Sequence, residues 1–333
     1  MEIQTVSVCL LARNEEKYLP GILADIAEQT YPRQLTELIL VDSCSEDGTL
    51  AILTAFRQNY LPMYRNIRIL KNDGIIQASG WNTAIRAASC DAVARIDAHC
   101  HLPREYIAHN MRNLQNGEAV SGGICQMACL EQSHWHRTLL RAESSLFGSS
   151  IGRSTGQTQK RYVKSLSVGV YRKSVFDMVG LFNEELLRTE DNELHYRLRK
   201  AGYRLCLDPQ IRMNYYCRSS LGAMLRQKYG NGYWIGYTLA LCPGCISLYH
   251  LIPFGFVLGI LITSMLMAAG IFLPGLLMWG AYGLLTLIFS LCAIVKDPPH
   301  RTDLMLPVLF LLMHLSYGIG TFSELLGWLR KKR

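Results

Sequence analysis

Two long stretches without a charged side chain constrain the fold of this 333-residue chain more than any other feature. No Asp, Glu, Lys or Arg occurs from Ile235 to Val295 or from Leu304 to Ser323. A membrane-spanning helix needs about 20 apolar residues, so the first stretch can supply two spans and the second one. Residues before about 219 have the polar content of a soluble protein. We therefore expect a soluble front, 1–218, and a membrane-embedded back, 237–333, with two or three apolar segments.

A segment of mixed character joins these two parts. Residues 219–236 combine apolar and aromatic side chains with Arg226 and Lys228. This composition suits an amphipathic helix in the headgroup layer of a bilayer, in contact with membrane lipids. An ordinary amphipathic helix packed on the front domain explains the same composition equally well.

The membrane topology stays open at this stage. Three crossings would put the basic tail, Leu329–Arg333, opposite the front domain. Basic clusters favour the cytosolic side, however, and a re-entrant segment would remove the conflict. The first residues do not form a signal peptide. We expect a multi-pass protein of the inner (plasma) membrane whose front domain faces the cytoplasm.

The net charge of +8 is compatible with a nucleic-acid partner, but a membrane explains it better. The Lys and Arg residues are dispersed along the chain, whereas nucleic-acid-binding proteins concentrate them in a stripe or patch. Membrane proteins gather positive charge on the cytosolic side, which explains the sign. We therefore expect no nucleic acid among the partners.

The front domain alternates strand-like and helix-like patterns. Short apolar runs that suit buried strands lie at 6–11, 37–42, 67–70 and 92–97. Helical patterns separate them, and this alternation predicts a parallel sheet wound with helices, the α/β class. Further strand-like runs lie at 118–124, 167–171 and 203–207, and a helix opens after Thr189.

Polar residues stand where two of these elements end or begin. The strand 92–97 ends in Asp97, and His99 follows two residues later. Ligands bind at the carboxyl ends of parallel strands, and a carboxylate with an imidazole can hold a divalent cation that grips a diphosphate. A surface Asp and His that simply close a strand explain the pair as well. Likewise, Glu190 and Asp191 suit either a catalytic role or the first turn of a helix.

Four motifs in order resemble those of an inverting family-2 glycosyltransferase with the GT-A fold. They are Asn14-Glu15, Val41-Asp42-Ser43 with Asp47-Gly48-Thr49, Asp97-Ala98-His99, and Thr189-Glu190-Asp191. The resemblance covers residues 5 to about 217. It implies a Rossmann-like mixed sheet with helices on both faces, and a nucleotide-sugar donor, usually a UDP-sugar. His99 departs from the commoner Asp-x-Asp metal motif of the family.

The resemblance implies three groups of site residues. The nucleotide sugar would contact Asn14, Glu15, Asp42, Asp47, Asn82 and Asp97. Asp97 and His99 would hold a divalent metal, Mn²⁺ or Mg²⁺. Asp191, with Glu190 beside it, would be the base that takes the proton of the acceptor hydroxyl. Taken singly, a helix cap explains Asp191, turn or cap positions explain Asp42 and Asp47, and a solvated charge at a helix start explains Glu15.

The Asp-Ala-His triplet and the C-terminal spans also resemble bacterial exopolysaccharide membrane glycosyltransferases of the succinoglycan type. This implies transfer of glucose from a UDP-sugar to a polyprenyl-diphosphate-linked saccharide. A polyprenyl-phosphate or glycolipid glycosyltransferase shares the motifs, and a catalytically silent membrane scaffold that binds nucleotide sugars is the non-enzyme alternative. The Gln-x-x-Arg-Trp motif of processive synthases is absent. A homo-oligomer, or association with other polysaccharide-assembly enzymes, is left open.

Overall fold

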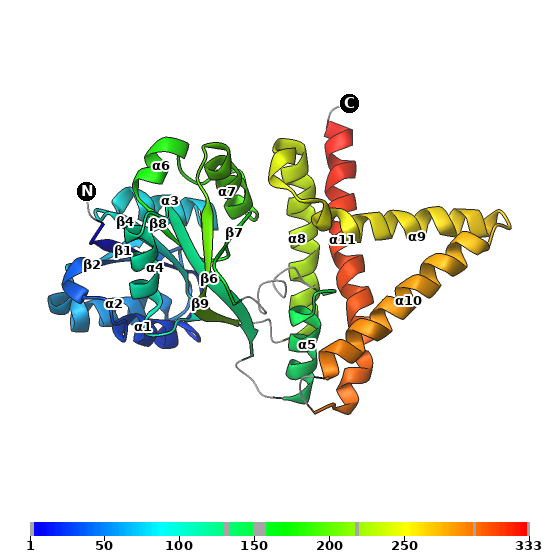
Figure 1. The fold of residues 1–333 in the computed structure, drawn as a ribbon, viewed down its shortest axis with the longest axis horizontal. Coiled ribbons are helices and arrows are strands. Elements are labelled where there is room, and N and C mark those ends of the chain that lie inside the picture. The colour runs from blue at the N-terminus through cyan, green and yellow to red at the C-terminus, as the bar shows by residue number, and fades with distance from the viewer. Residues whose placement is uncertain (1–2, 130–132, 149–157, 217–219, 296–297, 332–333) are drawn as a thin grey trace. The chain divides into compact units, whose positions relative to one another are not determined.

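The computed structural model describes residues 3–129, 133–148, 158–216, 220–295 and 298–331 (Figure 1). The chain divides into two compact units. We call residues 1–126 and 154–215 the sheet unit, and residues 127–153 and 216–333 the helical unit. Each unit is described by itself.

A mixed sheet forms the centre of the sheet unit. In the described residues its strands are β1 Val6–Ala12, β2 Thr36–Asp42, β3 Asn66–Lys71, β4 Ala92–Asp97, β5 Cys100–His101, β6 Val120–Ala128, β7 Arg161–Val163, β8 Val170–Arg172 and β9 Leu205–Tyr216. Their order is β3-β2-β1-β4-β8-β6-β9-β5, with β7 beside β9. The strands β3, β2, β1 and β4 are parallel, and β8 joins β4 in the antiparallel sense. The predicted mixed α/β sheet is confirmed.

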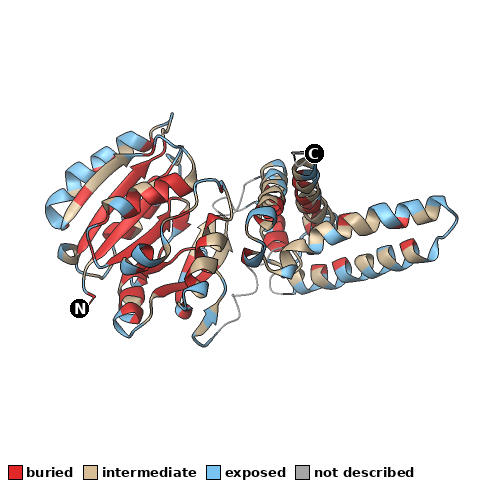
Figure 2. Ribbon diagram, turned by 90° about the horizontal axis from the view of Figure 1, so that it is seen from above, coloured by how far each residue is buried: buried red, intermediate tan, exposed pale blue. Residues whose placement is uncertain are grey.

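Helices cover both faces of this sheet. They are α1 Leu19–Ala27, α2 Thr49–Tyr60, α3 Gln77–Ala87, α4 Tyr106–Gln115, α6 Ser174–Val179 and α7 Glu190–Lys200, with the 3-10 turns η1 Arg33–Leu35 and η2 Leu61–Met63. Successive residues of a strand point to opposite faces. Val8 of β1 packs in a core with α1, α2 and α4, and its neighbour Cys9 packs in a second core with α3, α6 and α7. The strands are accordingly the most deeply buried elements (Figure 2).

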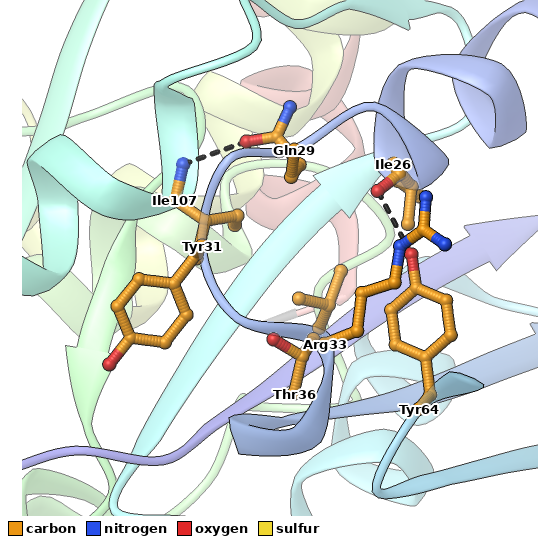
Figure 3. A pocket seen from close by; sticks show the side chains of 8 residues that line it. Ile26, Gln29, Tyr31, Arg33, Thr36, Tyr64 and Ile107 are labelled. Carbon is orange, nitrogen blue, oxygen red and sulfur yellow. Dashed lines mark hydrogen bonds between the residues drawn. The ribbon is translucent and has the colours of Figure 1, made fainter.

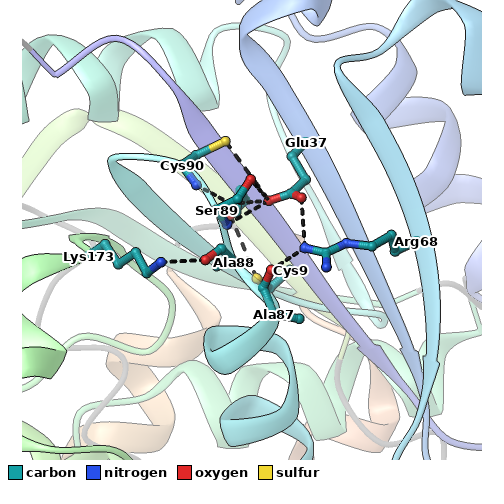
Figure 4. Close-up of polar contacts among 9 residues, drawn as sticks. Cys9, Glu37, Arg68, Ala87, Ala88, Ser89, Cys90 and Lys173 are labelled. Atoms are coloured by element: carbon teal, nitrogen blue, oxygen red, sulfur yellow. Dashed lines mark hydrogen bonds and ion pairs between the residues drawn. The ribbon is translucent and has the colours of Figure 1, made fainter.

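A buried carboxylate fixes the amino ends of the strands (Figure 4). Oε2 of Glu37, the second residue of β2, accepts hydrogen bonds from Ser7 Oγ at 2.7 Å and Ser89 N at 3.0 Å. Its Oε1 lies 2.8 Å from Arg68 Nη2 on β3. Burial opposes ionisation of this group, but the donors prevail and lower the pKa of the Glu37 carboxyl below its ordinary value. The network therefore ties β1, β2 and β3 together at the end of the sheet opposite Asp42.

The helical unit contains long apolar helices. Its described elements are α5 His134–Ser144, α8 Leu221–Leu241, η4 Pro243–Cys245, η5 Leu248–Leu251, α9 Ile252–Ala268, α10 Leu273–Ile294, η6 Arg301–Met305 and α11 Leu306–Lys331. Among the described residues, Leu248–Ala268, Leu273–Ile294 and Arg301–Arg330 are long and apolar enough to cross a membrane. They correspond to the three apolar segments predicted from the sequence. Helix α8 continues to Leu241, beyond the predicted 219–236, and its place in the headgroup layer stays a prediction.

Candidate active site

The carboxyl ends of the parallel strands bring two predicted acids to one edge of the sheet. Asp42, the last residue of β2, lies opposite Ala12 of β1, and Asp97, the last residue of β4, lies opposite Leu11 of the same strand. Both residues are 6% exposed. The carboxyl end of β1 is therefore flanked by one carboxylate from β2 and one from β4.

Hydrogen bonds lock together the loops that follow β1 and β2. Asn14 has a φ of 54°, in the left-handed region that Asn tolerates better than most residues, and its Oδ1 accepts from Glu46 N at 2.8 Å. Asp47 accepts from Glu16 N at 3.1 Å and from Thr49 N at 3.0 Å. The hydrogen bond from the Thr49 side chain, with these backbone donors, lowers the pKa of Asp47. Both residues hold the loops in shape, and their contact with a nucleotide stays a prediction.

His99 uses both ring nitrogens within the protein. Its Nδ1 lies 3.2 Å from Glu15 Oε1, and its Nε2 is hydrogen-bonded to the hydroxyl of Tyr215 on β9. A neutral imidazole has one donor and one acceptor nitrogen, and these two partners use both. A metal ion at His99 would therefore have to displace Glu15 or Tyr215, and the role of His99 as a ligand stays a prediction.

Asp97 is better placed to receive a cation. Gln77 Nε2 approaches its Oδ1 at 3.4 Å, a long contact that leaves the carboxylate able to accept further ligands. Among the described residues, no three His, Cys, Asp or Glu side chains lie close enough together to hold an ion. Mg²⁺ sites of enzymes that bind phosphates often use one or two carboxylates and take their other ligands from the substrate and water. The site fits a cation of that kind at Asp97.

A buried cation stands two residues before Asp97. Arg95 is 5% exposed, and its Cζ lies 5.0 Å from the ring centre of Trp81 and 5.4 Å from that of Phe182. Its Nη2 donates to Ser167 O at 3.2 Å, while Nε and Nη1 are buried and have no hydrogen-bond partner among the described residues. The aromatic faces stabilise the guanidinium, but a buried positive charge also needs negative charge nearby.

Three carboxyl groups, those of Asp97, Glu190 and Asp191, interact electrostatically with Arg95. Burial raises the pKa of Glu190 to about 8, with the neighbouring Asp191 adding to the rise and Arg95 opposing it. Burial likewise raises the pKa of Asp191, again with Arg95 opposing and Asp97 adding. Coulomb interactions weaken with distance, so groups that shift one another's pKa belong to one region of the fold. The fold therefore brings Asp97, Glu190 and Asp191 into one electrostatic cluster around Arg95.

The start of α7 positions the last two members of this cluster. Thr189, the N-cap residue, has a φ of 68°, a left-handed conformation that is strained for a β-branched side chain. Asp191 lies within the first turn, where its Oδ1 accepts a local hydrogen bond from Asn192 N at 2.8 Å. Backbone strain is often retained where it positions a functional group. Thr189 is the N-cap residue, and Asp191 lies in the first turn, where the helix dipole favours a carboxylate, so its catalytic role stays a prediction.

A neutral histidine borders the cluster. His195 lies one turn after Asp191 on α7 and is fully buried. Its Nε2 lies 2.8 Å from the hydroxyl of Tyr171, and its Nδ1 lies 2.9 Å from Ser165 Oγ. Burial, with the positive charge of Arg95, lowers the pKa of His195 to about 3, so it holds these hydroxyls without adding charge.

Asn82 makes contacts that the sequence did not suggest. Its Nδ2 donates to Phe182 O at 2.9 Å and to Glu184 Oε1 at 2.7 Å, and its Oδ1 accepts from Phe182 N at 2.8 Å. The amide thus holds the segment before α7 onto α3. Its predicted contact with the nucleotide sugar stays a prediction.

A small pocket lies at the other end of the sheet (Figure 3). Its lining includes Gln29, Tyr31, Arg33, Thr36 and Tyr64. Thr36 is the first residue of β2, whereas Asp42 is the last, so this pocket lies at the amino ends of the strands. It contains none of the predicted site residues.

The chain matches a known family over just over half of its length. Residues 7–179 match the family described as Glycosyl transferase family 2. The chain belongs to this family. The matched region holds the first three of the four motifs, and family membership makes the protein a glycosyltransferase, as the resemblance implied.

Relatives and a solved structure agree with this assignment. A Methanococcus voltae protein named dolichyl N-acetyl-alpha-D-glucosaminyl phosphate 3-beta-D-2,3-diacetamido-2,3-dideoxy-beta-D-glucuronosyltransferase is 25% identical, with 96% of this chain and 97% of that protein covered. The succinoglycan biosynthesis protein ExoA of Rhizobium meliloti is 23% identical, over 96% and 94% of the two chains. The mannosyltransferase PcManGT of Pyrobaculum calidifontis, solved with GDP-Man and Mn²⁺, superposes with a TM-score of 0.61 at 17% identity, over 94% and 86% of the chains. This last likeness confirms the GT-A fold.

Proposed function

We propose that the protein is an inverting glycosyltransferase that moves glucose from a UDP-sugar to a polyprenyl-diphosphate-linked saccharide at a membrane. The observation that carries the proposal is the cluster of Asp97, Glu190 and Asp191 around the buried Arg95. The relatives support the acceptor class, because one is named for a dolichyl phosphate sugar and the other for succinoglycan biosynthesis, and both match nearly the whole chain.

Asp191 is the proposed base. Burial raises the pKa of Asp191 toward neutral pH, and a general base works best when its pKa lies near the pH at which the enzyme operates. It takes the proton of the acceptor hydroxyl while that oxygen bonds to the anomeric carbon and the bond from this carbon to the diphosphate breaks. Attack from the side opposite the leaving UDP inverts the anomeric carbon. Glu190, with a pKa of about 8, keeps its proton at neutral pH and does not add a second charge beside the base.

The donor lies, in this proposal, on the loops after β1 and β2. Glu15 and Asp42 there offer carboxylate acceptors for the nucleoside, and Asp97 lies at the diphosphate. A divalent cation held at Asp97 would neutralise charge on the leaving diphosphate. The buried Arg95 adds positive charge to the same region, because it interacts electrostatically with Asp97 and with Asp191.

The helical unit supports a membrane-bound acceptor. Three of its helices are long and apolar enough to cross a bilayer. We propose that the protein is a multi-pass protein of the plasma membrane with the sheet unit in the cytoplasm, where a polyprenyl-linked saccharide would present its terminal sugar.

The test is a transfer assay with the full-length protein in lipid nanodiscs. A panel of UDP-sugars is supplied with Mn²⁺ or with EDTA, with and without a polyprenyl-linked lipid extract, and both UDP release and the labelled lipid are measured. We expect UDP-glucose to be consumed only with the lipid extract and the metal. Sugar attached directly to polyprenyl phosphate would identify the alternative enzyme class. UDP binding without turnover under every condition would indicate the scaffold and refute the proposal.

A further inference from the structure

We propose that α9 and α10 form a hairpin that enters the bilayer and returns to its starting side, while α8 and α11 remain together on that side. The C-terminus then lies on the same side of the membrane as the sheet unit. This inference concerns topology and does not depend on the proposed transfer reaction.

The hairpin itself has the surface of a membrane insert. No charged residue occurs in α9, α10 or the turn Ala269–Phe272 between them. In the most apolar stretch of each helix, only 11% of the residues are buried within the protein. At about 1.5 Å per residue, helices of 17 and 22 residues measure about 26 and 33 Å, close to the hydrocarbon core of about 30 Å. Figure 1 shows both helices projecting away from α8 and α11 of the same unit.

The helices α8 and α11, in contrast, form a tightly packed parallel pair. A Cβ on Gly232 would lie 1.9 Å from Tyr317 O, and one on Gly320 would lie 2.2 Å from Tyr229 O. Backbones approach this closely only where small residues line a helix–helix interface. The start of α8 packs on the start of α11, and Gly236 near the end of α8 meets Thr321 further along α11. The two helices therefore share one environment, and either both cross the membrane or neither does.

The short helix α5 shows which side they start from. It lies in Met127–Arg153, between two parts of the sheet unit. This segment is too short for two crossings of about 20 apolar residues each, so α5 stays on the side of the sheet unit. Arg141 of α5 is ion-paired with Asp303, just before α11, and Glu143 lies 3.2 Å from Lys228 of α8. Both pairs are buried, so the starts of α8 and α11 are on the same side as α5.

These contacts require an even number of crossings between Lys228 and Asp303. The hairpin supplies two. A crossing by α8 would add a third and would separate Lys228 from Asp303, which α5 holds together. In addition, the part of α8 after Lys228 ends at Leu241 and is too short to span a bilayer. Neither α8 nor its partner α11 therefore crosses.

The composition of the pair agrees with a place at the membrane surface. Ion pairs are disfavoured in hydrocarbon, and α8 carries four aromatic residues of the kinds that gather at membrane–water interfaces: Tyr229, Tyr233, Trp234 and Tyr237. In the most apolar stretch of α11, 39% of the residues are buried inside the protein, against 11% in the hairpin helices. The basic tail Leu329–Arg333 is then on the same side of the membrane as the sheet unit, as the positive-inside rule requires if that unit is cytosolic.

Tag accessibility in sealed membrane vesicles tests the proposal on the full chain. One tag is placed at the N-terminus, in the sheet unit, a different one at the C-terminus, and protease is added without detergent. We expect both tags to be digested together in vesicles of one orientation and protected together in the other. A third tag, inserted after Gly270, should be protected wherever the terminal tags are digested. Terminal tags on opposite sides, or a Gly270 tag digested together with them, would overturn the proposal.

A matched pair of lysine substitutions provides a second test. Leu284 in α10 is 60% exposed and Ile319 in α11 is 46% exposed, and both lie in the middle of an apolar helix. A lysine at the centre of a spanning helix strongly disfavours insertion, whereas one in the headgroup layer does not. We expect Leu284→Lys to lower the carbonate-resistant membrane fraction at least tenfold and Ile319→Lys to leave it unchanged. Equal behaviour of the two variants would contradict the inference.

Discussion

Replacing Glu190 with Gln tests whether this carboxyl is held protonated beside Asp191. The side chain is 4% exposed, and burial followed by the charge of Asp191 raises its pKa from 4.5 to about 8. The folded protein thus binds this proton more tightly than the unfolded chain. The resulting stability is complete below pH 4.5 and is lost as the pH rises through 8. At about 1.4 kcal/mol per pH unit, this interval corresponds to at most about 5 kcal/mol. Sharing of the proton with Asp191 lowers the expected effect to about 2–4 kcal/mol.

The assay is urea unfolding of the sheet unit within the full-length protein, followed by pulse proteolysis at pH 5, 7 and 9. The natural protein should lose about 2–4 kcal/mol more stability than Glu190→Gln between pH 5 and 9. The control is Glu193→Gln, which removes a carboxylate from the same first turn, one that pairs with Arg197 at 2.7 Å. This control should keep the pH dependence of the natural protein. Parallel stability curves for the natural protein and Glu190→Gln would refute the reasoning.

Three further predictions concern other contacts. Arg95→Met removes the charge that lowers the pKa of Asp191, so the acid limb of the pH profile of donor turnover should move to higher pH. Asn82→Ala removes three hydrogen bonds of about 1 kcal/mol each and should destabilise the sheet unit by about 3 kcal/mol in chemical denaturation. Gly232→Ala should lower the thermal stability of the helical unit because its Cβ meets Tyr317 O, whereas Gly222→Ala, whose Cβ meets open space, should not; equal effects would contradict the close packing of α8 on α11.

The elements that the sequence predicted well are those with local signals. The run 92–97 is confirmed as β4 to the residue, and the helix expected after Thr189 begins at Glu190. The strands β5 and β7 are two and three residues long, too short to leave a pattern. The predicted strand at 167–171 is shorter, Val170–Arg172, and runs antiparallel to β4. Strand direction has no local signature, because it depends on how the chain returns to the sheet.

The candidate site shows the same division between local and long-range information. Asp97 is visible in the sequence because it ends an apolar strand. The sequence gives one indication of Arg95, because it is a lone cation in that strand, on the same face as Asp97. Its neighbours Glu190 and Asp191, however, come from the far end of the unit. Tyr215, which occupies a ring nitrogen of His99, is equally distant in the chain. Such partners are set by the tertiary fold.

The most direct test of the central claim is turnover by Asp191→Asn. UDP release from the donor is measured in the presence of the lipid acceptor, and UDP binding is measured on the same preparations. If Asp191 is the base of a site shared with Asp97, turnover should fall at least about 100-fold while UDP affinity stays within about threefold. Turnover of the variant within a few-fold of the natural protein would contradict the account.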